Sequence, residues 1–285
     1  MNKKIPTGPG LPPPADQSTS QVPLVAARGL DSGDHKRYAP YFAAVYATLG
    51  AVVVAAAAAF VVLVVKPGHK PPAAWSSWRP TPGSLSKMTT EIAEHVSHEY
   101  RLSANGGQLV AIVPSKPTVT SGTTSISIKA IAIRNAGKAA NAGGGIEVLD
   151  STGSEMYTFC GLGDHCSIAS GTPSTDRGRL VRREALEVAL YTFKFVPSVK
   201  SVIEFMPPAP NATSSDLLFL RKENYARELS QPLDDTLRLR EPPLPTEADA
   251  LEAPTIDALT LPSIFTYQLT ALQAGGAALV LDRAT

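Results

Sequence analysis

Two cysteines, Cys160 and Cys166, frame the local motif with the clearest chemistry in this chain, CGLGDHC. In an oxidising compartment the two sulfurs pair, and the two glycines between them let so short a loop turn. The alternatives are a metal or nucleophile site that also uses Asp164 and His165, or two free thiols. Zinc sites usually have a second pair of ligands elsewhere in the chain, and this sequence offers none. We therefore predict a structural disulfide.

A second group of titratable residues lies in a predicted helix that begins at a serine cap. It contains Glu91, Glu94, His95, His98 and Glu99. At 100° per residue, both histidines lie opposite the apolar side of that helix. A metalloprotease helix would place its two histidines four residues apart, with glutamate beside the first, whereas these are three apart. We therefore predict a charged, solvated helix face and no zinc site.

Four arginines gather at the start of a second predicted helix: Arg177, Arg179, Arg182 and Arg183. Backbone N–H groups also point outward at a helix N-terminus, so this cluster is a candidate contact for a phosphate or carboxylate of an envelope polymer. Acidic residues are interleaved with the arginines, which is typical of an ordinary solvated surface. Both interpretations remain open at this point.

No other motif predicts catalysis or a cofactor. Three glycines at 143–145 precede a predicted strand and do not join a strand to a helix, so they are not a dinucleotide fingerprint. No serine stands in a Gly-x-Ser-x-Gly elbow, and Asn211 begins only a formal glycosylation sequon. We expect no catalytic residue, no cofactor and no metal, and we favour a protein that is not an enzyme.

The elements that must position these residues indicate an α+β fold on a mostly antiparallel sheet with two main helices. The helices are predicted over 84–101 and 176–196, and the strands over 108–113, 125–134, 145–150, 155–160, 199–206, 216–220, 263–272 and 277–282. The third and fourth strands are expected to form one hairpin, and the last two strands another around Gly275 and Gly276. A short helix is expected at 223–229, and residues 231–262 are predicted to be an irregular proline-rich excursion.

Residues 41–65 contain neither a charge nor a proline in twenty-five positions. A helix of that length would be roughly 37 Å long, enough to cross a hydrocarbon core of about 30 Å. A cleaved signal peptide is the alternative, but its apolar core would span about 7–15 residues behind a short basic start. Forty residues precede this run. We predict an uncleaved transmembrane helix over 38–66, with the lipid bilayer as its partner.

The flanking segments complete a plan for the whole chain. Residues 1–37 read as a disordered, proline-rich cytoplasmic tail, 67–83 as a proline-rich spacer, and 84–285 as an exported domain. Basic residues on the two sides of the span balance, so the positive-inside rule gives no orientation. The cysteine pair favours an oxidising compartment for the domain. We expect a plasma-membrane protein with a cytoplasmic N-terminus and an extracytoplasmic C-terminal domain. The alanine- and valine-rich composition is more typical of a bacterial protein than of a eukaryotic one.

Charge and plan together suggest what such a protein does. The formal net charge is +1, which does not favour nucleic acid as a partner. The plan resembles that of anchored subunits of bacterial envelope machines, such as those of secretion or cell division. We expect a binding or scaffold module of a cell-envelope assembly, with other envelope proteins as its partners.

Two alternatives belong to other classes. One is an exported ligand-sensing domain. The predicted N-terminal tail is too short to hold a signalling domain, which counts against this alternative. The other is an exported hydrolase whose acid and base residues are distant in sequence. A pocket with converging carboxylates or a histidine would favour the hydrolase, whereas an open sheet edge or an apolar patch would favour the binding module.

Overall fold

The computed structural model describes residues 35–65, 74–121, 124–134, 145–209, 212, 216–238, 241–245, 247 and 251–283. The chain divides into two compact units, Met1–Lys70 and Pro71–Thr285. Most of the predicted tail, part of the predicted spacer, two of the three glycines at 143–145, and Asn211 lie outside the described residues.

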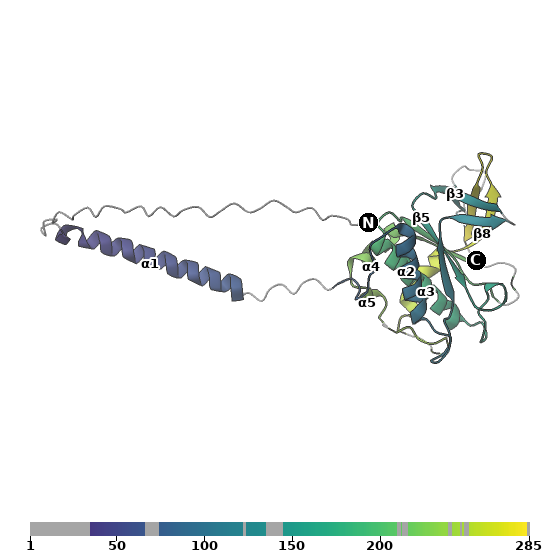
Figure 1. Cartoon of the computed structure of the whole chain (residues 1–285), viewed down its shortest axis with the longest axis horizontal. Helices are drawn as coiled ribbons and strands as arrows, with labels where there is room; N and C mark the ends of the chain where they lie inside the picture. The colour runs from purple at the N-terminus through teal and green to yellow at the C-terminus, as the bar shows by residue number, and fades with distance from the viewer. Residues whose placement is uncertain are drawn as a thin grey trace, which may run out of the picture. The chain divides into compact units, whose positions relative to one another are not determined.

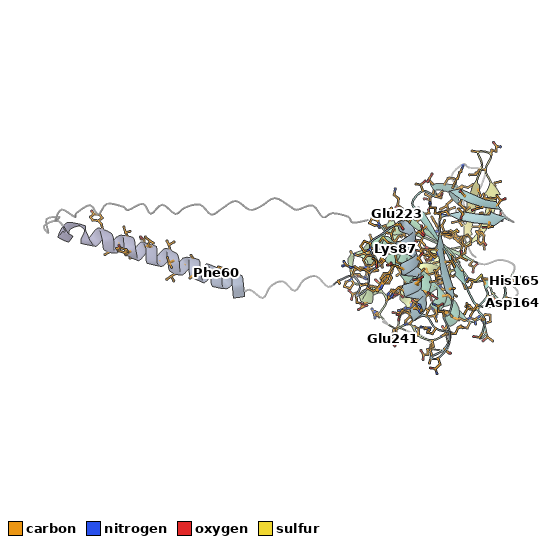
Figure 2. The ribbon with its side chains drawn as sticks, viewed as in Figure 1. Phe60, Lys87, Asp164, His165, Glu223 and Glu241 are labelled. Carbon is orange, nitrogen blue, oxygen red and sulfur yellow. A yellow bond between two sulfur atoms is a disulfide. The ribbon has the colours of Figure 1, made fainter. Side chains whose placement is uncertain are left out.

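The first unit contains helix α1, which covers His35–Val65 and is 31 residues long (Figure 1). Its described apolar side chains are exposed; Leu49 is 58% exposed and Phe60 is 67% exposed (Figure 2). Among the residues that the structure describes, no helix combines the length and apolarity required to cross a membrane.

One nine-stranded sheet organises the described part of the second unit. Its strand order is β1-β5-β6-β7-β8-β9-β3-β2, with β4 paired to β3. The strands are β1 Ala111–Ser115, β2 Thr118–Ser121, β3 Thr124–Arg134, β4 Ile146–Asp150, β5 Ser154–Cys160, β6 Ser201–Phe205, β7 Leu217–Arg221, β8 Ile264–Ala271 and β9 Ala277–Arg283. Only the β5–β6 and β3–β9 pairs are parallel among these strands. The predicted α+β class with a mostly antiparallel sheet is confirmed.

Helices cover one face of this sheet. The longer ones are α2 Leu85–Glu99 and α3 Thr175–Phe195, and the shorter ones are α4 Ala226–Ser230, α5 Leu233–Thr236 and α6 Ala253–Thr260. Three 3-10 turns complete them, η2 Asp164–Cys166, η3 Lys222–Tyr225 and η4 Leu261–Ser263. α2 and α3 lie side by side in Figure 1 and contact each other. Each starts at a serine cap, Ser84 and Ser174, whose side chain accepts a backbone N–H bond.

Two apolar cores form because successive side chains of a strand point to opposite faces. On β6, Val202 belongs to the core beneath the helices, whereas its neighbour Ile203 belongs to a second core on the other face. On β5, Tyr157 and Met156 divide in the same way. The helix-covered core is the larger one, and it contains most of the buried residues of α3.

The two predicted hairpins had different outcomes. β8 and β9 pair antiparallel, with Gly275 and Gly276 at positive φ in the turn, so the C-terminal hairpin is confirmed. The hairpin predicted from 145–150 and 155–160 is wrong, because β4 pairs with β3 while β5 pairs with β1 and β6. Gly153 does turn at positive φ, but β5 is buried on both faces and lies inside the sheet, where two other strands flank it.

The excursion predicted over 231–262 also differs from the structure, because its described residues include α5 and α6. The prolines of this segment led to the prediction of irregular structure in place of both helices. Pro232 is the N-cap of α5, and α6 has a proline in its first turn, where the missing N–H leaves no helical bond unmade. The prolines therefore start these helices and do not disrupt them.

Candidate functional site

The two cysteines form a disulfide in the loop that follows β5. His165 and Cys166 have positive φ values of 53° and 64°, a backbone region that costs energy for residues other than glycine. Asp164 and His165 are exposed at the surface (Figure 2). In the part of the chain that the structure describes, no group of three His, Cys, Asp or Glu residues is arranged to hold a metal ion.

The histidines of α2 have unlike surroundings. His98 is exposed, whereas His95 is half-buried and stacks on the indole of Trp78, with ring centroids 3.9 Å apart. Tyr191 of α3 stands perpendicular to both rings, at 5.4 Å from Trp78 and 5.6 Å from His95. Burial lowers the pKa of His95, so its neutral form is favoured. The prediction of a solvated face is therefore wrong for His95, because Trp78 covers it.

The four arginines predicted as anion contacts are turned toward the protein itself. Arg177 donates to the carbonyl of Ser170 at 3.0 Å, and Arg179 and Arg182 both bind the carboxylate of Asp257 on α6. The hydrogen bonds from Arg179 lower the pKa of Asp257. Anion binding stays a prediction for this cluster, and an anion would have to compete with Asp257 for two of its members.

Arg183 occupies the centre of a buried polar network. Its side chain is 3% exposed and its Nε donates to Glu252 at 2.6 Å. Its Nη1 contacts Glu187 at 3.3 Å and also donates to the hydroxyl of Tyr100. That hydroxyl donates to Glu187 at 2.7 Å. The network therefore ties the C-cap residue of α2 and the residue before α6 to one face of α3.

A line of carboxyl groups leads from this network into the core. Glu184 lies three residues before Glu187 on the same face of α3, and Glu204 lies on β6. Burial raises the pKa of Glu184 most, and the charges of Glu187 and Glu204 raise it further. Glu184 and Glu204 are 0% exposed, and no described residue hydrogen-bonds to either carboxyl group. Burial raises the pKa of both well above the ordinary value. The neutral, protonated form is therefore favoured at both sites.

Strand register explains why Glu204 points toward α3. It is paired with Tyr157 in the parallel β5–β6 ladder, and the Tyr157 hydroxyl lies 2.7 Å from the hydroxyl of Thr192 on α3. Glu155 precedes Tyr157 by two residues on the same face of β5, and burial raises its pKa to about 7. The sheet face beneath α3 thus has titratable groups at positions where burying an apolar side chain would cost less free energy.

A cleft of about 200 Å³ opens beside this network. It is lined by Ser76, Ser77, Trp78, His95, Glu99, Arg183, Glu187, Tyr191, Leu233, Asp234 and Leu237. Two larger hollows, of about 510 and 670 Å³, lie beside Lys200 and beside the disulfide loop. Their described linings have no buried titratable residue. The small cleft is therefore the candidate site, since it joins an open surface to groups whose pKa values are displaced.

Sequence reasoning missed Glu184, Glu187 and Glu204 as candidates. A signal was present for Glu184, which lies four residues after Leu180 and four before Val188, so it falls within the apolar stripe of its helix. No comparable signal predicts the buried ion pair of Arg183, because its partner Glu252 is 69 residues away in the sequence.

No protein-family model, no curated protein and no solved structure matches this chain. The function must therefore be argued from the site itself.

We predict that the Arg183–Glu252 pair stabilises the domain far more than an exposed pair does. Glu252→Gln should lower the free energy of unfolding by roughly 3 kcal/mol, because it removes one carboxylate from a buried guanidinium. Asp282→Asn is the matched control, since Asp282 pairs with Arg134 on the surface at 3.3 Å and should cost less than about 1 kcal/mol. Chemical denaturation measures both, and equal losses would contradict the prediction.

We also predict that Glu204 makes stability depend on pH. The folded state raises its pKa, so the folded protein holds a proton that the unfolded chain releases above about pH 4.5. The contribution of Glu204 to stability is therefore greatest at low pH and falls as pH rises toward its folded-state pKa. Each unit of displacement corresponds to about 1.4 kcal/mol.

Glu204→Gln is uncharged at every pH and tests this expectation. The unfolding free energy of the variant, measured from pH 4 to 8, should decline less steeply than that of the unmodified chain. Glu223→Gln, on a side chain that is 71% exposed, should leave the slope as it is. Parallel curves for the unmodified chain and Glu204→Gln would show that Glu204 does not titrate differently on folding.

Proposed function

We propose that this chain is a single-pass plasma-membrane protein with a cytoplasmic N-terminus. Its extracytoplasmic α+β domain would act as a binding or scaffold module of a cell-envelope assembly. The cleft beside Trp78 would be the place where the domain holds a group of its partner.

The proposed anchor rests on the sequence. Residues 41–65 have neither charge nor proline, and α1 covers them with the backbone hydrogen bonds of a helix, as a lipid environment requires. The finding that no described helix spans a membrane covers only the described residues. The structure describes the backbone at 61–65 and not the side chains there.

The proposed orientation rests on the Cys160–Cys166 bond. Disulfides persist in oxidising compartments and are rare where glutathione and thioredoxin keep thiols reduced. A domain on the far side of the plasma membrane fits that requirement, and the opposite orientation does not.

The single observation that carries the binding role is the cleft. Trp78, His95 and Tyr191 form a wall of rings, and buried carboxyl and guanidinium groups lie behind it. Buried charged groups cost stability unless they are fully paired. Titratable groups with displaced pKa values beside an opening are candidates for contacts with a ligand. Sheet edges at β1 and β4, each with one partner strand among those described, offer further contact surface.

A hydrolase is the second candidate, because Glu99, Glu187, Asp234 and His95 converge on this cleft. Burial raises the pKa of Glu187, which suits a general acid. Against this role, one oxygen of Glu187 already accepts from Tyr100 and Arg183. A residue that holds a buried guanidinium in place is poorly suited to give up and regain a proton, so the binding role is favoured.

The proposed topology predicts how the protein behaves on intact cells. Protease added outside should remove the C-terminal domain, residues 84–285, and spare the N-terminal tail, because only the domain is exposed to the outside. Antibodies to tags at the two ends report the two parts separately. Protection of the domain until the membrane is permeabilised would contradict the orientation.

The binding role predicts that contacts of the domain are concentrated at the cleft. A photo-cross-linking amino acid in place of Ser77, an exposed lining residue, should give a discrete adduct in the cells that produce the protein. The same amino acid in place of Thr152, which is exposed in the 510 Å³ hollow, should give at most a small fraction of it. Adducts of equal yield at both positions, or at Thr152 alone, would reject the cleft as the contact site.

A further inference from the structure

The hollow of about 510 Å³ lies at one end of strands β4, β6 and β7. Lys200 directly precedes β6 and Lys222 directly follows β7, and both line the opening. Leu149 of β4 also lines it and packs against the second core. The hollow therefore combines an apolar side with two ammonium groups.

The two lysines lie directly opposite each other across neighbouring strands. The β6–β7 ladder pairs Ser201 with Arg221, and the next residues continue it, since the N–H of Lys222 donates to the carbonyl of Lys200 at 2.9 Å. Like charges that are directly opposite in an antiparallel pair destabilise it. Among the residues that the structure describes, neither of these ammonium groups forms an ion pair. An anion between them would offset their repulsion.

The acidic residues at this opening are held by other groups. Asp150 accepts the backbone N–H of Thr152, and hydrogen bonds from Thr152 lower its pKa. Glu147 and Glu223 contact the guanidinium of Arg221 at 2.7 and 3.5 Å. Formal charges around the opening therefore balance as a whole, and the positive charge that has no carboxylate beside it is confined to the lysine pair.

A phosphomonoester matches this pair better than a single carboxylate does. It has a charge of about −1.5 to −2 at pH 7 and three acceptor oxygens, whereas an ammonium group has only donors. The hydroxyl of Ser201 also lines the hollow and lies 2.7 Å from that of Ser154. When Ser154 is the donor of that bond, the proton of Ser201 is left for a ligand oxygen.

The size of the hollow indicates a ligand larger than phosphate alone. Its volume of about 510 Å³ is within the range of about 300–1,000 Å³ that is typical of pockets for small molecules. The side chain of Leu149 and the methylene groups of the lysines can contact the organic part of such a ligand.

We infer that this hollow binds a phosphomonoester, either of a small soluble molecule or of a lipid headgroup. Lys200 and Lys222 would flank the phosphate, and Ser201 would donate a hydrogen bond to it. The inference goes beyond the proposed function, because it assigns a different opening of the domain and a ligand that is not a protein.

Isothermal titration calorimetry of the full chain in detergent micelles tests this inference, with a titration into empty micelles as the blank. Glycerol 3-phosphate should bind saturably. Glycerate has a single negative charge, and it should bind at least roughly fivefold more weakly. Dihexanoyl phosphatidic acid is the lipid probe, and tighter binding of this probe than of glycerol 3-phosphate would identify the headgroup as the source. Dihexanoyl phosphatidylcholine has no net charge and should not bind.

Two variants locate the site. Lys200→Gln and Lys222→Gln should each weaken the binding of the phosphomonoester by roughly two- to fivefold. Arg101→Gln removes one positive charge from an exposed residue outside the lining of the hollow and should leave binding unchanged. Without ligand, each lysine substitution should leave the midpoint of thermal unfolding unchanged or raise it, because it removes the repulsion between like charges.

The inference would be overturned if neither phosphomonoester bound saturably, or if glycerate bound as tightly as glycerol 3-phosphate. Equal affinity for phosphatidic acid and phosphatidylcholine would exclude the headgroup. Equal effects of all three substitutions would show that the anion binds elsewhere and would also overturn the inference.

Discussion

The enclosure of α3 is the constraint on which the rest of the domain depends. Thirteen of its residues are buried, including Arg183 and Glu184, so its charged side chains cannot be left to water. An unpaired buried guanidinium would cost several kcal/mol, and Arg183 therefore requires Glu252 and Glu187 beside it. These partners fix the position of α6 and, through Tyr100, the end of α2. The polar groups of one helix thus set where its neighbours lie.

The same enclosure leaves Glu184 and Glu204 in a costly position. Replacing such groups by apolar side chains is often neutral or stabilising, so packing alone does not account for them. Neither has a hydrogen-bond partner among the described residues, and both are more stable when protonated. They continue the line of carboxyl groups from Glu187 at the cleft, since burial and then the neighbouring Glu187 and Glu204 raise the pKa of Glu184.

Local patterns predicted the fold class and both main helices, because caps and apolar stripes are contained in a few consecutive residues. The β8–β9 hairpin was equally local, since Gly275 and Gly276 alone supply its turn. The partners of β5 were not predictable in this way, since they are strands distant in sequence. The site was missed for the same reason: Trp78, His95 and Tyr191 meet only after α2 and α3 have packed.

The position of the cleft has a consequence for how binding can influence the rest of the protein. Trp75 is in the core, where its indole donates to the carbonyl of Glu228 at 3.0 Å, and Trp78 follows three residues later in the cleft wall. The first described residues of the second unit, Pro71–Thr285, therefore form part of the candidate binding site. A ligand held against Trp78 would restrain this segment directly, since the same few residues lead from the cleft toward the N-terminal part of the chain.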